Sequence, residues 1–94
     1  MHGTHAVVRV RVRGDEAGAR WTVSASRRVG SAVQRNRAKR RLREAMRQVE
    51  LPVGVDVVVI ARRSARDCKF AELVGDLRAM IAQGAADESI EVRR

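Results

Sequence analysis

The segment that most restricts the possible fold is Val55–Ala61, a nearly unbroken run of β-branched side chains that reads V-D-V-V-V-I-A. A run of this length and composition is typical of a strand that is covered on both faces. Pro52 and Gly54 come just before it and stop any preceding helix. We therefore expect a sheet in which this segment lies at or near the middle and both of its faces are packed.

Two earlier segments show the alternation of half-buried strands. In residues 5–13 the valines alternate with Arg9, Arg11 and Arg13, and in residues 20–26 the side chains of Trp21, Val23 and Ala25 fall on one side. The glycine-containing stretch at 14–19 is typical of a turn. These patterns predict a β-hairpin with one apolar face and one cationic face.

Two amphipathic helices are also predicted. Ser31 is a suitable N-cap for a helix from Ala32 to about Val49, with its apolar residues on one arc. A helix from about Phe70 has apolar residues at helical spacing and is expected to end at Gly84. The arc of the first helix opposite to its apolar residues carries a polar stripe of Asn36, Arg40, Arg43 and Arg47.

These elements predict one domain over residues 1–94, of the α+β or two-layer α/β class, in which a small sheet packs against helices. The ordered core is expected at about residues 5–83, and residues 85–94 are expected to form a disordered tail. Only 2% of the residues are aromatic, so the core is expected to be small and aliphatic. A chain of this size buries about 60–65% of its unfolded surface, which argues against a deep active site.

Positive charge is the strongest indication of function. Twenty Lys and Arg residues against eleven Asp and Glu residues give a formal net charge of +9, which favours a polyanionic partner. Most of the cations are arginines, whose planar guanidinium groups bind phosphate and stack on bases. Residues 35–43 contain six cations in nine positions, and only Glu44 offsets this run. We therefore predict contact with RNA or DNA.

Cys68 is the only cysteine, which excludes an intramolecular disulfide and favours a reducing compartment. It has no histidine partner in the sequence nearby, so an inert thiol is predicted. No apolar run approaches the length of about 20 residues that spans a bilayer, and the first residues do not resemble a signal peptide. A soluble cytoplasmic protein is expected.

The remaining candidate sites are predicted to be structural. Trp21 lies on the apolar side of its strand, so core packing is favoured over base stacking, and the same holds for Phe70 in its helix. His2 and His5 are expected in a frayed terminus, without the further ligands that a metal site needs. An i, i+4 pair, Glu72 and Asp76, is expected on an exposed helical face. No catalytic residues and no metal site are predicted.

An Arg35-Asn36-Arg37 tripeptide opens the arginine-rich helix and follows a basic loop, Ser26-Arg27-Arg28-Val29-Gly30. Together with the Ala32-Val33 pair and the later V-V-V-I-A-R segment at 57–62, this arrangement closely resembles the bacterial ribonuclease P protein family. The tripeptide is the hallmark of that family. The resemblance extends over about residues 6–83.

The resemblance implies a ribonuclease P protein-like fold of the ribosomal protein S5 domain 2-like type. It comprises a small mixed sheet, an arginine-rich helix that joins two parallel strands by a left-handed crossover, and a C-terminal amphipathic helix; the usual crossover is right-handed. Family members usually begin with a basic, aromatic-containing helix that helps to wall a groove. This chain begins almost at its first strand, so a fold that lacks most of that helix is expected.

The resemblance also implies a function: a subunit of the ribonuclease P endoribonuclease, which removes the 5′ leader of precursor tRNA. In the family the RNA subunit performs hydrolysis with bound Mg²⁺, while the protein binds no cofactor alone. Its partners are the ribonuclease P RNA and precursor tRNA, with one monomeric protein per RNA. The positions that match RNA-contacting residues are Arg27, Arg28, Arg35, Asn36, Arg37, Lys39, Arg40, Arg41 and Arg43. Additional candidate contacts are Arg9, Arg11, Arg47 and Arg62.

Three alternatives remain open from the residues themselves. A DNA-binding regulator would insert the arginine helix into the major groove, normally beside a second helix. A ribosomal-type protein would bind folded RNA without a processing role, and the charge pattern does not separate it from a ribonuclease P subunit. A protein nuclease would need clustered carboxylates or histidines, which the sequence does not indicate.

Overall fold

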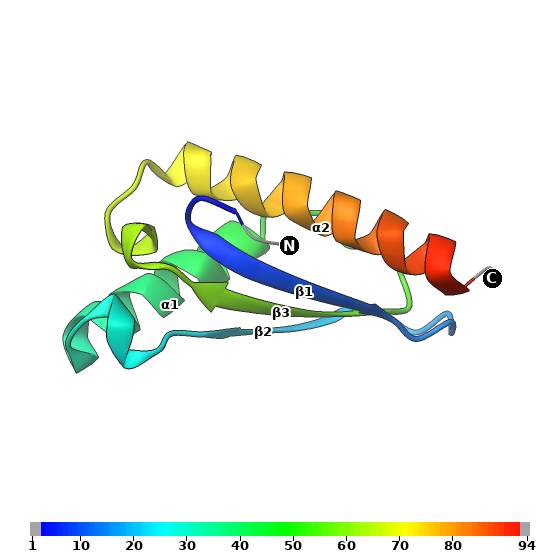
Figure 1. Cartoon of the computed structure of the whole chain (residues 1–94), viewed down its shortest axis with the longest axis horizontal. Coiled ribbons are helices and arrows are strands. Elements are labelled where there is room, and N and C mark those ends of the chain that lie inside the picture. Colours follow the sequence, from blue (N-terminus) through cyan, green and yellow to red (C-terminus); the bar gives the residue numbers. More distant parts are fainter. Residues whose placement is uncertain (1–2, 93–94) are drawn as a thin grey trace.

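The computed structural model describes residues 3–92, which form a three-stranded sheet, two long helices and two short 3-10 helices. The predicted small α+β fold is confirmed, and Figure 1 shows α2 lying along the sheet above β1. No helix in residues 3–92 is long and apolar enough to cross a membrane. In chain order the elements are β1 (Ala6–Val12), β2 (Arg20–Ser24), η1 (Arg27–Val29), α1 (Ala32–Met46), β3 (Val55–Ala61), η2 (Arg63–Arg66) and α2 (Phe70–Val92).

Strand β3 is the central strand, as predicted, but the predicted hairpin of β1 and β2 is wrong. The strand order is β1-β3-β2, with β3 antiparallel to β1 and parallel to β2. Although β1 and β2 follow each other in the sequence, the most continuously apolar strand lies between them. Its apolar side chains are best buried in the middle of a sheet, and this outweighs the preference for local pairing.

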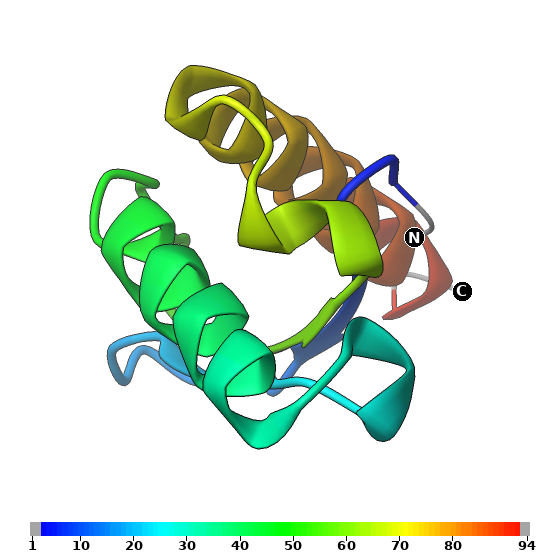
Figure 2. The same ribbon diagram turned by 90° about the vertical axis from the view of Figure 1, so that its left-hand side faces the viewer.

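The helices cover one face of the sheet. Along β3, Val57 and Val59 are buried, whereas Val58 between them is 37% exposed. The neighbouring strand has the same alternation, since Val8 pairs with Val59 and Arg9 pairs with Val58. Figure 2 shows both helices on the same side of the sheet. The expectation that both faces of β3 are covered is therefore wrong for residues 3–92, because valine also favours strands that are only half buried.

Helix α1 begins where the sequence predicts. The Ser31 hydroxyl accepts a hydrogen bond from the Gln34 backbone N–H at 3.3 Å, and the Gln34 side-chain oxygen accepts from the Ser31 N–H at 2.9 Å. This reciprocal capping box satisfies two N–H groups at the start of the helix. The helix ends at Met46, earlier than predicted, although Val49 is still buried.

Helix α2 is longer than predicted. It continues through Gly84 to Val92, so the prediction that it ends at Gly84 is wrong. The predicted tail is therefore helical through Val92, and residues 93–94 lie outside the described residues. A glycine inside a helix costs about 1 kcal/mol relative to alanine. Burial of Leu73, Leu77 and Ile81 in the core offsets this cost.

The core is aliphatic, as predicted. Trp21 and Phe70 are half-buried and pack against it, which confirms the prediction that both belong to the core. The molecule measures 42 × 22 × 21 Å along its principal axes. The largest fully buried side chains are Leu42, Met46, Leu73, Leu77 and Ile81.

A cluster of charged side chains joins all three strands at one end of the sheet. Arg13, which follows β1, donates to Asp56 Oδ1 at 2.5 Å and to the Gly18 carbonyl at 2.8 Å. Arg20, in β2, donates to both oxygens of the same carboxylate at 2.9 and 3.2 Å. The hydrogen bond from Arg20, followed by that from Arg13, holds the pKa of Asp56 below its usual value.

Replacing Asp56 with Asn is expected to destabilise the protein near neutral pH and to have less effect in acid. The pKa of Asp56 is lower in the folded state than in the unfolded chain, where it is about 3.9. The ionised carboxylate therefore stabilises the fold at a pH above about 3.9, and this stabilisation is lost as the pH falls through the pKa of the folded state. Urea unfolding of both proteins from about pH 6 to about pH 2.5 measures the difference. Glu16→Gln is the control, because Glu16 is exposed and forms no ion pair with the side chains of residues 3–86. A difference between Asp56→Asn and the unsubstituted protein that is independent of pH would contradict the prediction.

Candidate nucleic-acid interface

Short-range hydrogen bonds shape the basic loop that precedes α1. The Ser26 hydroxyl accepts from the Arg28 backbone N–H at 3.3 Å and starts η1. Gly30 has a φ of 142°, a region that favours glycine, and a Cβ at this position would collide with the side chain of Gln34. The loop therefore turns the chain from β2 into α1 and leaves Arg27 and Arg28 exposed.

Arginine side chains connect this loop to η2 by hydrogen bonds to backbone carbonyl groups. Arg35 donates to the Gly30 carbonyl at 3.0 Å, and Arg37 donates to the Arg66 carbonyl at 2.9 Å. In the reverse direction, Arg66 donates to the Val29 carbonyl at 3.0 Å. These bonds hold the basic loop and the start of α1 against η2, which is distant in the sequence.

Arg41 is the most firmly held of the predicted contact residues. Its half-buried guanidinium donates to the Ala65 carbonyl at 2.8 Å and to the carbonyl of Cys68. Arg41 therefore joins the middle of α1 to the segment between η2 and α2. The neighbouring Arg40 is exposed and makes no contact of this kind with residues 3–86.

Five of the predicted cations on η1 and α1 lack such partners. The ion pairs among the side chains of residues 3–86 involve His5, Arg13 and Arg20, and none involves a cation of η1 or α1. Like charges on adjacent turns repel one another unless counterions or a polyanion lie close by. Among the side chains of residues 3–86, none forms a side-chain hydrogen bond or ion pair with Arg27, Arg28, Lys39, Arg40 or Arg43.

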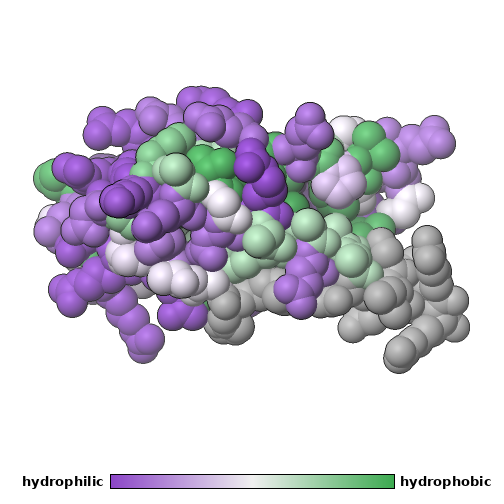
Figure 3. Space-filling model, turned by 90° about the horizontal axis from the view of Figure 1, so that it is seen from above, coloured by the Kyte–Doolittle hydropathy of each residue, from purple (hydrophilic) through white to green (hydrophobic). Residues whose placement is uncertain are grey.

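A shallow hollow of about 540 Å³ lies on the outer face of α1. The predicted polar stripe is exposed along this helix, as expected from its position opposite buried Ala38 and Leu42. Figure 3 shows hydrophilic side chains crowded over the left-hand end of the molecule, where α1 begins. The hollow is lined by Val33, Asn36, Arg37, Lys39, Arg40 and Arg43.

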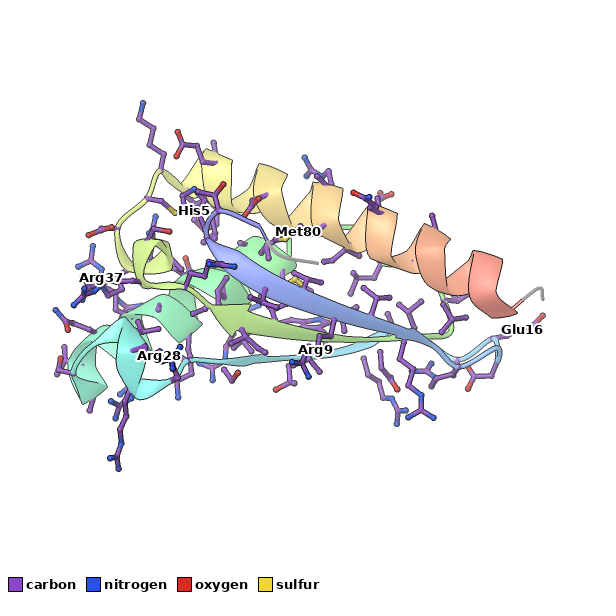
Figure 4. All side chains as sticks on the ribbon, viewed as in Figure 1. His5, Arg9, Glu16, Arg28, Arg37 and Met80 are labelled. Carbon is purple, nitrogen blue, oxygen red and sulfur yellow. The ribbon has the colours of Figure 1, made fainter. Side chains whose placement is uncertain are left out.

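The uncovered face of the sheet is a second surface with exposed cations, and we call it the open face. Arg9 extends from it on the side away from α2 (Figure 4), and Arg11 lies two residues further along β1 on the same face. Arg20 also lies there but is bonded to Asp56. The open face consists of Val7, Arg9, Arg11, Arg20, Thr22, Ser24, Asp56, Val58 and Ile60.

The open face and the basic loop meet at a further hollow of about 370 Å³. Arg28 of η1 lies there beside Arg62 and Arg63, which come from the start of η2 just after β3. Arg62, one of the additional predicted contacts, is therefore close to the basic loop that precedes α1. Arg47 is exposed at the other end of α1. The cationic surface thus continues from α1 to the sheet.

Unpaired cations such as Arg28 lie at the end of the molecule where α1 begins, whereas Arg13 and Arg20 at the other end are paired with Asp15 and Asp56. Figure 4 shows Arg28 and Arg37 at the end where α1 begins and Glu16 at the other end, beyond β1. Asp15 lies in the same turn as Glu16, and Arg13 holds its pKa below the usual value. This asymmetry directs the basic end toward a polyanion.

His5 is well ordered, so the prediction that it lies in a frayed terminus is wrong. Its Nδ1 is 2.7 Å from the Ser64 hydroxyl, and its backbone N–H donates to Asp76 at 3.0 Å. Its Nε2 is 3.8 Å from Glu72, so His5 fastens β1 to η2 and α2. His2 lies outside the described residues, and within them no three His, Cys, Asp or Glu side chains are grouped to hold a metal.

Cys68 is half-buried, and burial raises the pKa of its thiol.

The sequence of this chain matches a known protein family. The family model for Ribonuclease P matches residues 1–84 of the chain. The chain belongs to the ribonuclease P protein family.

Relatives within this family share the chain's sequence over about 70 residues. The ribonuclease P protein component of Gluconacetobacter diazotrophicus is 52% identical over 69 residues, which cover 70% of this chain and 60% of the relative. The ribonuclease P protein component of Corynebacterium jeikeium is 40% identical over 74 residues, which cover 72% and 57%. The chain thus matches three fifths or less of the length of these relatives.

Solved ribonuclease P proteins have the same fold. The RNase P protein from Thermotoga maritima superimposes with a TM-score of 0.74 at 27% identity, over 88% of this chain and 80% of that one. The RNase P protein of Staphylococcus aureus gives a TM-score of 0.68 at 26% identity, over 90% and 78%. The ribonuclease P protein-like fold expected from the sequence is therefore confirmed, with α1 connecting the parallel strands β2 and β3.

The contribution of η2 to the basic surface of this ribonuclease P family member was not predicted from the sequence. Arg66 donates a hydrogen bond to the Val29 carbonyl of η1, and Arg63 lines the same hollow as Arg28. The only signal in the sequence was the basic composition of residues 62–69. The exposure of Val33 was also missed, because the helical pattern does not show how neighbouring elements cover each face.

Arg41→Ala and Arg40→Ala are expected to differ in stability, although each removes one guanidinium from α1. The Arg41 variant leaves two carbonyl groups without donors and is expected to lower the free energy of unfolding by about 1–3 kcal/mol. The Arg40 variant is expected to change it by less than about 0.5 kcal/mol, because its side chain is exposed and unpaired. Urea denaturation at a single salt concentration compares the two. Equal stabilities would show that the carbonyl contacts of Arg41 do not support the fold.

Proposed function

We propose that this chain acts as the protein component of ribonuclease P and binds both the ribonuclease P RNA and the 5′ leader of precursor tRNA. The observation that carries the proposal is the set of five unpaired cations on η1 and α1: Arg27, Arg28, Lys39, Arg40 and Arg43. Phosphate groups of RNA supply the missing negative charge and release counterions on binding. Family membership supports ribonuclease P RNA as that partner.

In this proposal the two cationic surfaces have different tasks. Helix α1 and the basic loop bind the ribonuclease P RNA, with Asn36 contacting RNA beside the cations. Arg35 and Arg37 each use one nitrogen for a backbone carbonyl and retain further N–H groups for phosphate. The open face, with Arg9 and Arg11, binds the single-stranded leader.

The RNA subunit hydrolyses the phosphodiester with bound Mg²⁺, and the protein supplies positive charge. Two RNA molecules that approach each other repel through their phosphates. Arginine side chains between them reduce this repulsion, so the affinity for precursor tRNA rises and less Mg²⁺ is needed. One monomeric protein binds each RNA, in the cytoplasm.

A DNA-binding regulator is less well supported. In helix-turn-helix proteins the recognition helix follows a second helix after a tight turn. Here α1 lies between β2 and β3 in the chain, and its neighbour across the N-terminal loop is a strand. This arrangement does not present α1 in the usual manner to a major groove.

Arg40→Ala is expected to weaken RNA binding, whereas Arg78→Ala is expected to leave it nearly unchanged. Both residues are exposed arginines, and each variant removes one charge, but Arg78 lies on α2 and donates to the Gln48 carbonyl at 3.1 Å. One lost phosphate contact is worth about 1 kcal/mol, or about fivefold in affinity, and reduces the salt slope by about 1. Titration with ribonuclease P RNA at several salt concentrations measures both effects. Equal losses in the two variants would indicate an effect of net charge alone and would exclude a specific α1 surface.

The processing role is tested by reconstitution. Ribonuclease P RNA and a 5′-labelled precursor tRNA are incubated at low Mg²⁺ with and without the protein, and leader release is followed. We expect strong stimulation by the protein and no cleavage by the protein alone. Tight RNA binding without stimulation would contradict the processing role and would favour a ribosomal-type RNA binder.

A further inference from the structure

The most exposed large apolar side chain of the described residues lies within the arginine-rich face. Val33 is 77% exposed, compared with 65% for Val53 in the loop before β3 and 37% for Val58 on the open face. Isolated exposed valines are common on protein surfaces, so exposure alone indicates little. Val33 differs from Val53 because it lines the hollow of about 540 Å³ together with cations.

The hollow combines three kinds of chemistry on one helical face. Val33, Asn36, Arg37 and Arg40 are spaced by three and four residues, so their side chains are neighbours. The valine offers an apolar contact, and the Asn36 amide offers donors and an acceptor that match base edges. The guanidinium planes can stack on bases and bind phosphate. No carboxylate lines the hollow.

We infer that this hollow binds one unstacked nucleotide of a folded RNA. The base or ribose packs against Val33 and its edge reaches the Asn36 amide, while its phosphate lies between Arg40 and Arg43. The inference rests on the proposed function and deepens it, because it names the RNA feature that α1 recognises. A base within an A-form duplex is stacked and lies in a deep, narrow groove, so only an unpaired nucleotide offers its face and edge to this helix.

A purely electrostatic contact does not account for the hollow. Phosphates gain nothing from an apolar neighbour, and a valine on a phosphate-binding face displaces water without replacing its hydrogen bonds. The gain comes when an apolar base or sugar surface covers the valine. Val33 is therefore the residue of α1 that contacts a base or a ribose in addition to the phosphates.

The first test compares Val33→Ser with Val53→Ser, which make the same change at two exposed positions. Binding of ribonuclease P RNA to the full chain is expected to weaken about five- to tenfold for Val33→Ser, the loss of roughly one partly buried valine contact, and not for Val53→Ser. The salt slope is expected to stay unchanged in both, since no charge is removed. An unchanged affinity for Val33→Ser would overturn the inference, as would the same loss in both variants.

The second test uses two RNA hairpins of equal length and charge, one fully paired and one with a single bulged nucleotide. The unsubstituted protein is expected to bind the bulged hairpin several-fold more tightly, and Val33→Ser and Asn36→Ala are expected to remove this preference. Affinity for the fully paired hairpin is expected to stay the same in both variants. Equal binding of the two hairpins by the unsubstituted protein would overturn the inference.

Arg40→Ala separates this inference from the proposed function. If Arg40→Ala weakens RNA binding and Val33→Ser does not, the arginine face binds RNA through phosphates alone and only the nucleotide hollow is disproved. If neither variant changes the affinity for any of these RNAs, α1 is not an RNA-binding surface and the proposed function fails as well.

Discussion

The position of β3 between β1 and β2 is the constraint on which the rest of the structure depends. Because β2 is parallel to β3, the chain must return to the starting end of the sheet between them, and α1 makes that connection. Burial of Val57 and Val59 draws both helices to one face of the sheet. The location of the cationic helix, and the exposure of the opposite sheet face, both follow from this strand order.

Three arginines of α1 are held in place without being neutralised. Arg35, Arg37 and Arg41 donate to backbone carbonyl groups rather than to carboxylates. A carbonyl oxygen satisfies the geometry of a guanidinium donor, but it carries a dipole and no net charge, so each arginine keeps its full positive charge. The protein therefore presents a rigid surface with an unbalanced charge, which is suited to a polyanion whose phosphates occupy defined positions.

The same loops that order this surface also connect it to the sheet. Arg28 in η1 and Arg63 in η2 line one hollow, and Arg66 fastens η2 to η1. The cationic surface therefore passes from α1 around the end of β3 to the open face. Asp15 and Glu16 lie at the far end of the molecule, where Arg13 and Arg20 are paired with Asp15 and Asp56. The unbalanced positive charge therefore lies at the end that carries the start of α1, and this gives the protein a preferred direction of approach to a polyanion.

The sequence by itself determined where the strands lie, the Ser31 cap, the helical stripe with Arg40 and Arg43, and the membership of the ribonuclease P protein family. These features depend on local propensity, capping and periodicity, which neighbouring residues encode. Only the tertiary structure decided that β3 separates β1 from β2, that α2 continues past Gly84, and that Arg66 bonds to η1. Each of these depends on contacts between residues far apart in the chain, where burial of apolar surface outweighs local preference, and no pattern along the sequence records which distant groups meet.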